Sequence, residues 1–422
     1  MTAATTPAFK VVHLTTVDSS LRYLLRAQLA AVRDGGGEAV GVSAPGPDAE
    51  SLARDGIRHV PLTASTRAMD PLADLRAAAQ LWRILRRERP DVLHTHNPKP
   101  GLYGRVVGRL ARVPIVVNTN HGLYVTADHG RLRRTVVLGL EAVAARFSDA
   151  ELIQNPEDLD LLLQRRVNRR RRTRLLGNGI DLDRFRPGAV APAERAAVRA
   201  ELGAGPDDVV VGMVGRLVAE KGVLELLAAA RRLDDRYVVV VIGPDDPAKP
   251  DALDRDTVRE AEAAGVRFLG LREDVDRLYG AMDLFVLPSW REGFPRAAME
   301  AAASGLPVIA TDVRGCRQVV DHEVTGLLVP VRQPDPLAGA IRALGEDPDT
   351  RARYGAAGAG KARREFDERR VLRIVLETYA SSAERKGLDD LGCALRATIP
   401  ARLAEPAPVT TRPEPRPARR TP

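Results

Sequence analysis

Short apolar runs alternate with longer amphipathic segments along almost the whole chain. The runs have the length of a buried strand, and the segments between them repeat their apolar residues at the three- and four-residue spacing of a helix. Such regular alternation is typical of parallel sheets covered by helices. The pattern therefore predicts an α/β fold.

The first half of the chain contains one complete series of this kind. Its strands are expected to form one sheet, with the helices packed against it. The expected strands are residues 10–14, 39–42, 91–95, 115–118 and 151–154, and the expected helices are residues 20–34, 71–88 and 101–111.

The second half begins the series again. Two Rossmann-like, doubly wound units that face each other across a ligand-binding cleft are therefore predicted. The expected strands of the second unit are residues 209–214, 237–242, 266–269, 284–287 and 308–310, and its expected helices are residues 222–232, 275–281 and 295–304.

Composition places the domain boundaries. Residues 183–208 hold three prolines and several glycines, which suits an inter-domain connection, and residues 400–422 hold seven prolines and almost nothing apolar. A long helical pattern precedes that proline-rich end. We expect a first domain at residues 1–185, a linker at 186–208, a second domain at 209–364, a helix at 365–390 that crosses back to the first domain, and an unstructured tail at 391–422.

Size and cysteine content narrow the class of protein. The 422 residues are 44% hydrophobic and 28% charged, which is enough apolar surface for two cores. Cys316 and Cys393 lie in unrelated contexts, so neither a disulfide framework nor a zinc site is expected. The beginning of the chain has no secretory pattern, and the apolar runs are too short to span a bilayer. We therefore expect a cytoplasmic protein.

Positive charge is concentrated in one run. The formal net charge is +8, and residues 165–174 contain seven arginines. Such a run favours phospholipid head groups, phosphorylated substrates or nucleic acid, or it is simply a solvated basic face. Aromatic residues make up only 4% of the chain and none interrupts the run, so specific nucleic-acid binding is not expected.

Residues 131–147 form a second segment with two interpretations. Basic residues at 131, 133 and 134 precede apolar residues at 132, 136, 140, 143 and 147, which share one face of a helix. This helix either lies on an anionic bilayer, peripherally at the inner face of the cell membrane, or packs on the sheet in the ordinary way.

Candidate chemistry is densest at residues 287–312, where an expected strand ends in a loop that leads into a helix. Gly293 and Phe294 precede the helix, and Pro295 suits its first turn. Backbone N–H groups at such a helix start bind phosphate or sugar hydroxyls. Glu292 and Glu300 flank this start, and a carboxylate accepts two hydroxyl hydrogen bonds, as a sugar diol requires. The alternative is a solvated pair of surface glutamates.

Two cations follow the first strand of the second unit. Arg216 and Lys221 are expected to point into the cleft, where fixed positive charge would stabilise a diphosphate leaving group without a metal ion. The alternative is a surface ion pair with Glu220. The segment matches neither the P-loop nor the dinucleotide-binding fingerprint, which argues against kinases and dehydrogenases.

In the first unit, candidate residues follow the third and fourth strands. Asn97 and Lys99 precede a helix and form a candidate anion site on the acceptor side, while His121 follows the next strand. His94 and His96 have a spacing compatible with metal binding, but no third ligand is near in sequence. Three D-x-D triplets, which begin at residues 181, 274 and 347, are attributed to capping and solvation. No metal or other cofactor is expected.

These motifs resemble family 4 of the retaining glycosyltransferases, which adopt the glycosyltransferase-B fold of two facing Rossmann-like domains. The resemblance runs from about residue 11 to 379. Its most specific part is the E-x7-E motif within P-S-x-x-E-G-F-P, followed by G-x-P-V-I-A-T-D, at residues 288–312. One departure is the absence of a glycine pair after the first strand, where this chain has T-V-D-S-S at residues 16–20.

The resemblance assigns roles to the candidate residues. It implies that Glu300 binds the donor ribose and Glu292 the donor sugar, and that His121 contacts the sugar near the reacting carbon. It also implies that Arg216 and Lys221 bind the diphosphate. Further donor contacts are expected at Gly293, Phe294 and Pro295, and at Gly270 and Leu271 beside the base.

The expected function is transfer of a sugar, with retained configuration, from a nucleotide sugar to a hydroxyl group. Residues 94–121 are similar to members that extend lipid-linked saccharides, so a lipid-linked or polysaccharide-precursor acceptor is expected, with a UDP-sugar favoured as the donor. Three alternatives remain open at this point. They are a GDP-mannose-type transferase, a nucleotide-sugar epimerase of the same architecture, and a nucleic-acid-binding protein that uses residues 165–174.

Overall fold

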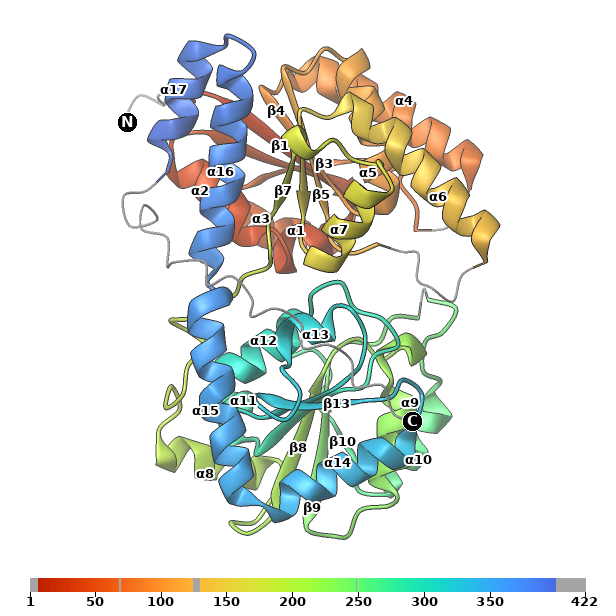
Figure 1. Cartoon of the computed structure of the whole chain (residues 1–422), viewed down its shortest axis with the longest axis vertical. Coiled ribbons are helices and arrows are strands. Elements are labelled where there is room, and N and C mark those ends of the chain that lie inside the picture. The colour runs from red at the N-terminus through yellow and green to blue at the C-terminus, as the bar shows by residue number, and fades with distance from the viewer. Residues whose placement is uncertain (1–6, 68–69, 124–129, 248, 400–422) are drawn as a thin grey trace, which may run out of the picture.

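The computed structural model describes residues 7–67, 70–123, 130–247 and 249–399. It contains two α/β domains, one above the other along the long axis of the molecule (Figure 1). The α/β class and the two doubly wound parallel sheets predicted from the sequence are confirmed.

The first domain is built on a parallel sheet with the order β3-β2-β1-β4-β5-β6-β7 in the described chain. Successive residues of β1 pack in different hydrophobic cores, because Val11 lies in one core and Val12 in the other. The strands are therefore buried on both faces, which explains their continuous apolar runs. They are β1 (Lys10–Val17), β2 (Glu38–Ala44), β3 (Arg58–Pro61), β4 (Val92–His96), β5 (Ile115–Asn120), β6 (Ala150–Ile153) and β7 (Thr173–Leu175).

Helices cover both faces of this sheet. Leu81 of α4 and Val107 of α5 pack in one core, and Leu21 of α1 and Leu29 of α2 pack in the other. Asp70 caps α4 by accepting from the backbone N–H groups of its first turn. The helices are α1 (Asp18–Tyr23), α2 (Arg26–Asp34), α3 (Ala49–Arg54), α4 (Pro71–Glu88), α5 (Pro98–Leu110), α6 (Arg131–Ala144) and α7 (Pro156–Gln164), with 3-10 turns η1 (Ala145–Phe147) and η2 (Arg170–Arg172).

The second domain repeats the design with the strand order β10-β9-β8-β11-β12-β13 in the described chain. Its strands are β8 (Val209–Val214), β9 (Tyr237–Ile242), β10 (Arg267–Phe268), β11 (Leu284–Leu287), β12 (Val308–Thr311) and β13 (Gly326–Val329). Its helices are α8 (Pro192–Glu201), α9 (Val223–Ala230), α10 (Arg255–Ala263), α11 (Val275–Ala281), α12 (Arg296–Ala303), α13 (Cys316–Val319), α14 (Pro334–Glu346) and α15 (Pro348–Glu365), with the 3-10 turn η3 (Ala219–Lys221).

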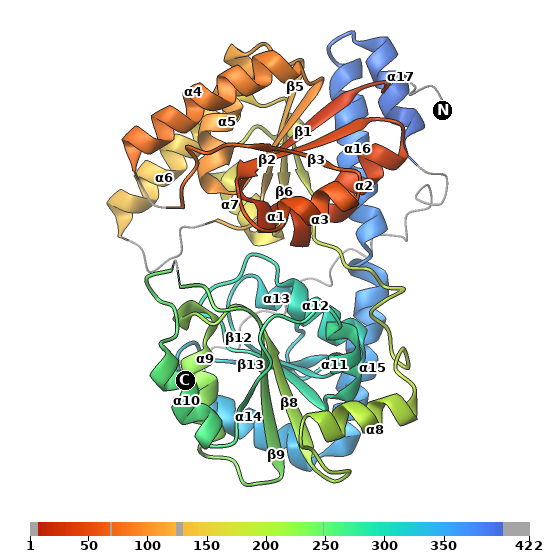
Figure 2. The same ribbon diagram turned by 180° about the vertical axis from the view of Figure 1, so that it is seen from behind.

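The chain returns to the first domain at its C-terminal end. Phe366, which follows α15, is buried in a core of the second domain, whereas Val375 and Tyr379 of α16 (Glu368–Glu384) are buried in a core of the first. Figure 2 shows α15 and α16 running one after the other along the same side of both domains. This pair of helices therefore links the two cores.

Several details differ from the sequence predictions. Strands β3, β7 and β13 were not predicted, and three further differences concern helices. The helix expected at residues 20–34 is broken between α1 and α2, although both parts bury leucines in the same core. Helix α8, expected within a linker, packs on the second domain through Val198 and Leu202. Residues 391–399, expected in an unstructured tail, lie mostly in α17 (Asp389–Ala397), whose Leu395 is fully buried against the core shared with α16. Residues 400–422 lie outside the described chain.

Candidate functional site

The carboxyl ends of the strands in the two sheets meet where the domains touch. Asn155, which follows β6, donates its side-chain N–H to the carbonyl of Gly293 at 2.9 Å, and Asn178, which follows β7, donates to the carbonyl of Phe294 at 2.9 Å. Both acceptors belong to the loop between β11 and α12. Two side chains of the first domain therefore fix the backbone of this loop of the second domain.

The two backbones come closest at Gly122 and Gly293. A Cβ atom added to Gly293 would lie 1.9 Å from the carbonyl oxygen of His121, and one added to Gly122 would lie 2.7 Å from the Cα of Gly293. Neither position therefore accommodates a side chain without separating the loops. This contact places His121 of the first domain directly beside the E-G-F-P segment of the second.

Ion pairs surround this central contact. Arg317 of α13 pairs with Glu157 of α7 at 2.9 Å, and the neighbouring Arg314 pairs with the buried Asp158 of the same helix. On another part of the boundary, Arg67 pairs with Asp246 at 2.9 Å. The described structure therefore has its domains in contact at several points rather than only through the chain connections.

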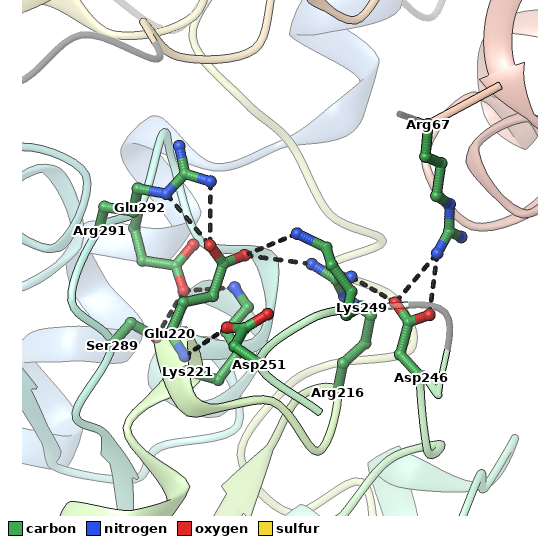
Figure 3. Close-up of polar contacts among 10 residues, drawn as sticks. All are labelled: Arg67, Arg216, Glu220, Lys221, Asp246, Lys249, Asp251, Ser289, Arg291 and Glu292. Atoms are coloured by element: carbon green, nitrogen blue, oxygen red, sulfur yellow. Dashed lines mark hydrogen bonds and ion pairs between the residues drawn. The ribbon is translucent and has the colours of Figure 1, made fainter. Parts of the chain in front are cut away.

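Lys221 and Glu292 form the centre of the expected donor site. Lys221 lies in η3 and its Nζ is 2.6 Å from Oε1 of Glu292, which also accepts from the hydroxyl of Ser289 at 2.7 Å (Figure 3). The Lys221 and Glu292 side chains are 21% and 10% exposed, so the pair is partly shielded from water. Such a pair presents a fixed cation and a fixed acceptor side by side.

Arg216 lies in a neighbouring network of charges. Its guanidinium is 2.6 Å from Asp246 and 3.4 Å from Glu220, and Glu220 also contacts Arg291 at 2.9 Å. Figure 3 shows Asp246 between Arg216 and Arg67, which come from different domains. Burial opposes ionisation of Asp246, but the hydrogen bond from Arg216 and the charge of Arg67 lower its pKa overall. An anion that binds to Arg216 would compete with this carboxylate.

Glu300 occupies the first turns of α12 and is largely buried. Its carboxylate lies 3.3 Å from the hydroxyl of Tyr279 and 3.8 Å from the guanidinium of Arg296. Burial raises the pKa of Glu300, and the charge of Arg296 and the Tyr279 hydrogen bond oppose the rise only in part. The ionised carboxylate therefore has unused acceptor capacity in a site of limited solvation.

The remaining residues expected to bind the donor come from loops of the second domain. Pro295 precedes the first residue of α12 and Phe294 packs edge-on against Phe366, with ring centroids 5.9 Å apart. Gly270 and Leu271 follow β10. The carbonyl of Gly270 accepts from the backbone N–H of Gly243 at 2.8 Å, and Leu271 is exposed.

The candidate acceptor residues are already engaged within the first domain. The side-chain carbonyl of Asn97 accepts from the backbone N–H of Thr16 at 3.3 Å. Lys99 is 2.6 Å from Asp74 of α4, and it also donates to the carbonyl of Thr66 at 3.1 Å. The structure thus places Asn97 at the sheet edge, and it pairs Lys99 with a carboxylate that would have to be displaced by an anionic acceptor.

Among the aspartates of the D-x-D triplets, some cap a helix or turn, as expected, whereas Asp274 forms an ion pair, which was not predicted. Asp347 caps α15 by accepting from the backbone N–H of Thr350 at 2.9 Å, and Asp181 accepts from that of Asp183 at 2.9 Å. Asp274 pairs with Arg272 at 2.6 Å.

The histidines differ from the prediction in one respect. His94 and His96 do have a third potential ligand, His13 of β1, and suitable atoms of all three lie within 4.8 Å of one another. His13 was not predicted as a ligand, because β1 and β4 are far apart in the chain. They are adjacent in the sheet, where His13 pairs with His94.

A surface cavity of about 410 Å³ lies elsewhere in the second domain. Arg186, Tyr279, Asp283 and Gly305 are among its lining residues, and none of the expected donor residues lines it. This cavity is therefore separate from the expected donor site.

Comparisons with known proteins agree with this geometry. Residues 23–184 match the profile described as "Glycosyltransferase Family 4", and residues 194–361 match the one described as "Glycosyl transferases group 1". A D-inositol 3-phosphate glycosyltransferase of Xylanimonas cellulosilytica is 33% identical over 318 residues, which cover 70% of this chain and 73% of the relative. The chain belongs to family 4 of the glycosyltransferases.

Two further comparisons describe relatives of this transferase. The UDP-Gal:alpha-D-GlcNAc-diphosphoundecaprenol alpha-1,3-galactosyltransferase of Escherichia coli is 28% identical over 298 residues, covering 69% of this chain and 76% of the relative. The crystal structure of HepE of Anabaena with UDP and glucose has a TM-score of 0.74 and 22% identity, covering 88% of this chain and 100% of HepE. At this identity the structural likeness shows the glycosyltransferase-B fold.

Several site residues were not identified from the transferase sequence. Asn155 and Asn178 position the loop, and Ser289 orients Glu292. Each lies within three residues of the end of a strand, so a search of all polar residues at strand ends would have found them. Asp246 and Arg67 carry no comparable sequence signal, because their pairing depends on how the domains are arranged.

Burial of Glu300 predicts a pH-dependent stability effect in the ligand-free transferase. Since the folded-state pKa is raised, the ionised glutamate destabilises the fold, and this loss develops as the pH rises from the ordinary value of 4.5 through the raised pKa. Glu300→Gln should therefore unfold at a higher temperature than wild type at about pH 7, with a much smaller difference at about pH 4. Scanning calorimetry at both pH values measures this, and Glu323→Gln at an exposed position is the control. An equal difference at both pH values would contradict the interpretation.

Proposed function

We propose that this transferase moves a sugar, with retained anomeric configuration, from a UDP-sugar to a hydroxyl of a lipid-linked saccharide, without a metal ion. The observation that carries the proposal is the assembly at the domain boundary. Lys221, Glu292 and the loop at Gly293 belong to the second domain, while His121 of the first lies against that loop.

Each residue has a role in this proposal that fits its surroundings. Glu300 is buried enough to bind a ribose diol strongly, and Glu292 is held by Ser289 and Lys221 in the orientation to accept from a sugar hydroxyl. Arg216 and Lys221 face the leaving diphosphate, whose negative charge grows as its bond to the sugar breaks. Two fixed cations at this place supply the stabilisation that a divalent metal would otherwise give.

The proposed reaction exchanges one bond to the anomeric carbon for another. The bond between this carbon and the diphosphate oxygen breaks with its electron pair on the oxygen, and the acceptor oxygen forms its bond from the same face. The acceptor proton passes to the leaving diphosphate oxygen. The protein then needs only to orient both substrates and stabilise charge, which suits a site of paired carboxylates and cations.

The lipid-linked acceptor and the uridine nucleotide are supported by the relatives. The galactosyltransferase of Escherichia coli is named for a UDP-sugar donor and an undecaprenol-linked acceptor, and the HepE structure contains UDP. A GDP-sugar donor remains the second candidate, since Gly270 and Leu271 present mainly backbone to a base. An epimerase would convert its nucleotide sugar without any acceptor.

Substitution of the two cations tests the proposed site. Arg216→Ala and Lys221→Ala should each reduce turnover by about a hundredfold, the loss expected when one preorganised charge-stabilising donor is removed. The measurement is transfer from a radiolabelled UDP-sugar to a polyprenyl-diphosphate-linked saccharide in EDTA. Arg236→Ala, which removes an exposed ion pair with Asp234 in the same domain, is the matched control and should keep wild-type turnover. Near-normal turnover in both site variants would refute the assignment.

We also assign the membrane contact to helix α6. Leu132, Val136, Leu140 and Val143 form an apolar stripe along it and are 80%, 52%, 51% and 49% exposed. The opposite side of α6 packs through Leu138. Helix α6 therefore packs on the domain through one face and leaves the apolar stripe exposed on another.

Positive charge flanks this stripe at both ends. Arg131 and Arg133 are exposed at the start of α6, and Arg146 lines a small surface hollow together with Arg166 and Arg169 of the arginine run. Basic residues beside an apolar stripe are typical of helices that lie on anionic bilayers, and each contributes about 1 kcal/mol near such a surface. Among the described residues, the transferase has no helix long and apolar enough to span a bilayer. Peripheral binding at the inner face of the cell membrane would bring the site to a lipid-linked acceptor.

Vesicle flotation tests this contact. Wild-type transferase should float with vesicles that contain anionic lipid, less so at high salt, and the triple variant Leu132→Gln, Val136→Gln, Leu140→Gln should stay in the dense fraction. Leu224→Gln, at an exposed position of the second domain, is the control and should float. Equal flotation of the triple variant and wild type, or no salt-sensitive binding at all, would contradict the assignment.

A further inference from the structure

The surface cavity of about 410 Å³ lies beneath the connection between the two domains. Residues 186 and 188–190 of this connection line one side of it, and Figure 2 shows the yellow-green connection running beside α15 to α8. The other side includes Asp283 and Pro307, which directly precede β11 and β12. The cavity therefore lies at the amino ends of these strands, whereas Arg216 and Glu292 of the expected donor site follow carboxyl ends.

Close contacts hold the connection over the cavity. A Cβ atom added to Gly280 would lie 2.4 Å from Cγ2 of Val190, so the Val190 side chain lies directly on the backbone of α11. Pro187 contacts Gly305, since a Cβ atom added there would be 3.4 Å from its Cγ. Between these contacts the chain turns at Gly188, whose φ of 72° is in the left-handed region. The outer wall of the cavity is therefore a packed segment with a defined turn.

Three arginines line the cavity, and two of them have no carboxylate partner within the described residues. Arg186 and Arg351 donate to backbone carbonyls, at 3.1 Å and 2.6 Å. Arg195, the third, pairs with Asp283 at 2.8 Å. Because a guanidinium has five N–H donors, Arg186 and Arg351 both have donors left for a ligand.

The carboxylates that line the cavity are already neutralised. Asp283 pairs with two arginines, each at 2.8 Å, and Asp276 pairs with Arg184. Arg184 and Arg199, the second partner of Asp283, are not among the lining residues, so they compensate these carboxylates from outside the cavity. The charge of the two arginines without a carboxylate partner is therefore uncompensated, and the cavity favours an anion.

Apolar surface forms much of the remaining wall. It comes from Val190, Met282 and Leu306, and from the ring of Tyr279. The hydroxyl of Tyr279 is already engaged, 3.3 Å from the carboxylate of Glu300, so Tyr279 offers ring surface rather than a hydrogen-bonding group. Cavities of about 300–1,000 Å³ with apolar walls and a few fixed polar groups are typical of small-molecule sites.

We propose that this cavity is a second ligand site of the transferase, for a small organic phosphate. A phosphate group carries nearly two negative charges and three acceptor oxygens, which match the two uncompensated guanidinium groups. Arg186 belongs to the connection and Arg351 to α15, so a phosphate between them would tie the connection to the second domain. The organic part of the ligand packs on Tyr279 and Val190. This site goes beyond the proposed function and uses none of the expected donor residues.

NMR titration with phenyl phosphate, observed on the ligand, tests the site, since this probe carries a phosphate group and an apolar ring. It should bind wild type and Lys221→Ala equally, because Lys221 belongs only to the expected donor site. Binding should weaken by about tenfold or more in Arg186→Ala, which removes one charged donor. Arg342→Ala is the matched control and should bind normally, since Arg342 also donates to a backbone carbonyl of the second domain but lies outside the cavity.

A second variant keeps every arginine. Ala352 lines the cavity at an exposed position of α15, so Ala352→Phe should fill the cavity without disturbing the core and weaken binding of phenyl phosphate at least about tenfold. Inorganic phosphate should bind wild type more weakly than phenyl phosphate does, because it leaves the apolar wall empty. Hydrogen exchange locates the site, since the amides of residues 186–191 should exchange more slowly when phenyl phosphate is bound.

Several results would overturn the proposal. Binding that is lost in Lys221→Ala but kept in Arg186→Ala would place the probe in the expected donor site. Absence of binding, equal affinity for inorganic phosphate, or unchanged exchange at residues 186–191 with the probe bound would also contradict the second site. None of these measurements requires transfer activity, so a failure of the proposed function would be distinguishable from a failure of this proposal.

Discussion

The contact between Gly122 and Gly293 is the constraint on which the site depends. Parallel strands bring their carboxyl ends to one edge of a sheet, so each domain alone presents a row of loops with no partner opposite them. The two glycines let the loop backbones touch, and Asn155 and Asn178 then hydrogen bond to the carbonyls of Gly293 and Phe294. The backbone of His121 lies against Gly293, the residue after Glu292, because no side chain separates these loops.

The cations of the expected donor site are balanced by carboxylates of the same domain. Clustered cations repel one another, and here each lies at short distance from an acidic side chain, as in the pairs Lys221–Glu292 and Arg216–Asp246. Part of each carboxylate remains available to hydroxyl groups. Asp246 also pairs with Arg67, which belongs to the first domain. One aspartate is thus shared between a cation of each domain.

The sequence predicted the features that depend on local pattern. Apolar runs located most of the strands, and the E-x7-E motif located Glu292 and Glu300 correctly at the two sides of a helix start. It missed β7, whose sequence T-R-L lies within the arginine run, and β3, whose R-H-V-P has little apolar character. It also missed the four-residue strand β13, although its sequence G-L-L-V is apolar. Contacts between elements that are distant in the chain could not be predicted from the local sequence pattern. Leu395 makes α17 a helix by packing on α16, and His13 joins His94 only because their strands are adjacent in the sheet.

The proposed function requires that a nucleoside diphosphate bind to the second domain through Glu300 and the two cations, without metal. Titration calorimetry of the purified transferase with UDP and with GDP in EDTA, repeated with Glu300→Ala, measures this binding. We expect UDP to bind in EDTA and this binding to be lost in Glu300→Ala. Binding of GDP alone would change the assigned donor nucleotide but not the assigned site, whereas binding of neither nucleotide would refute the site.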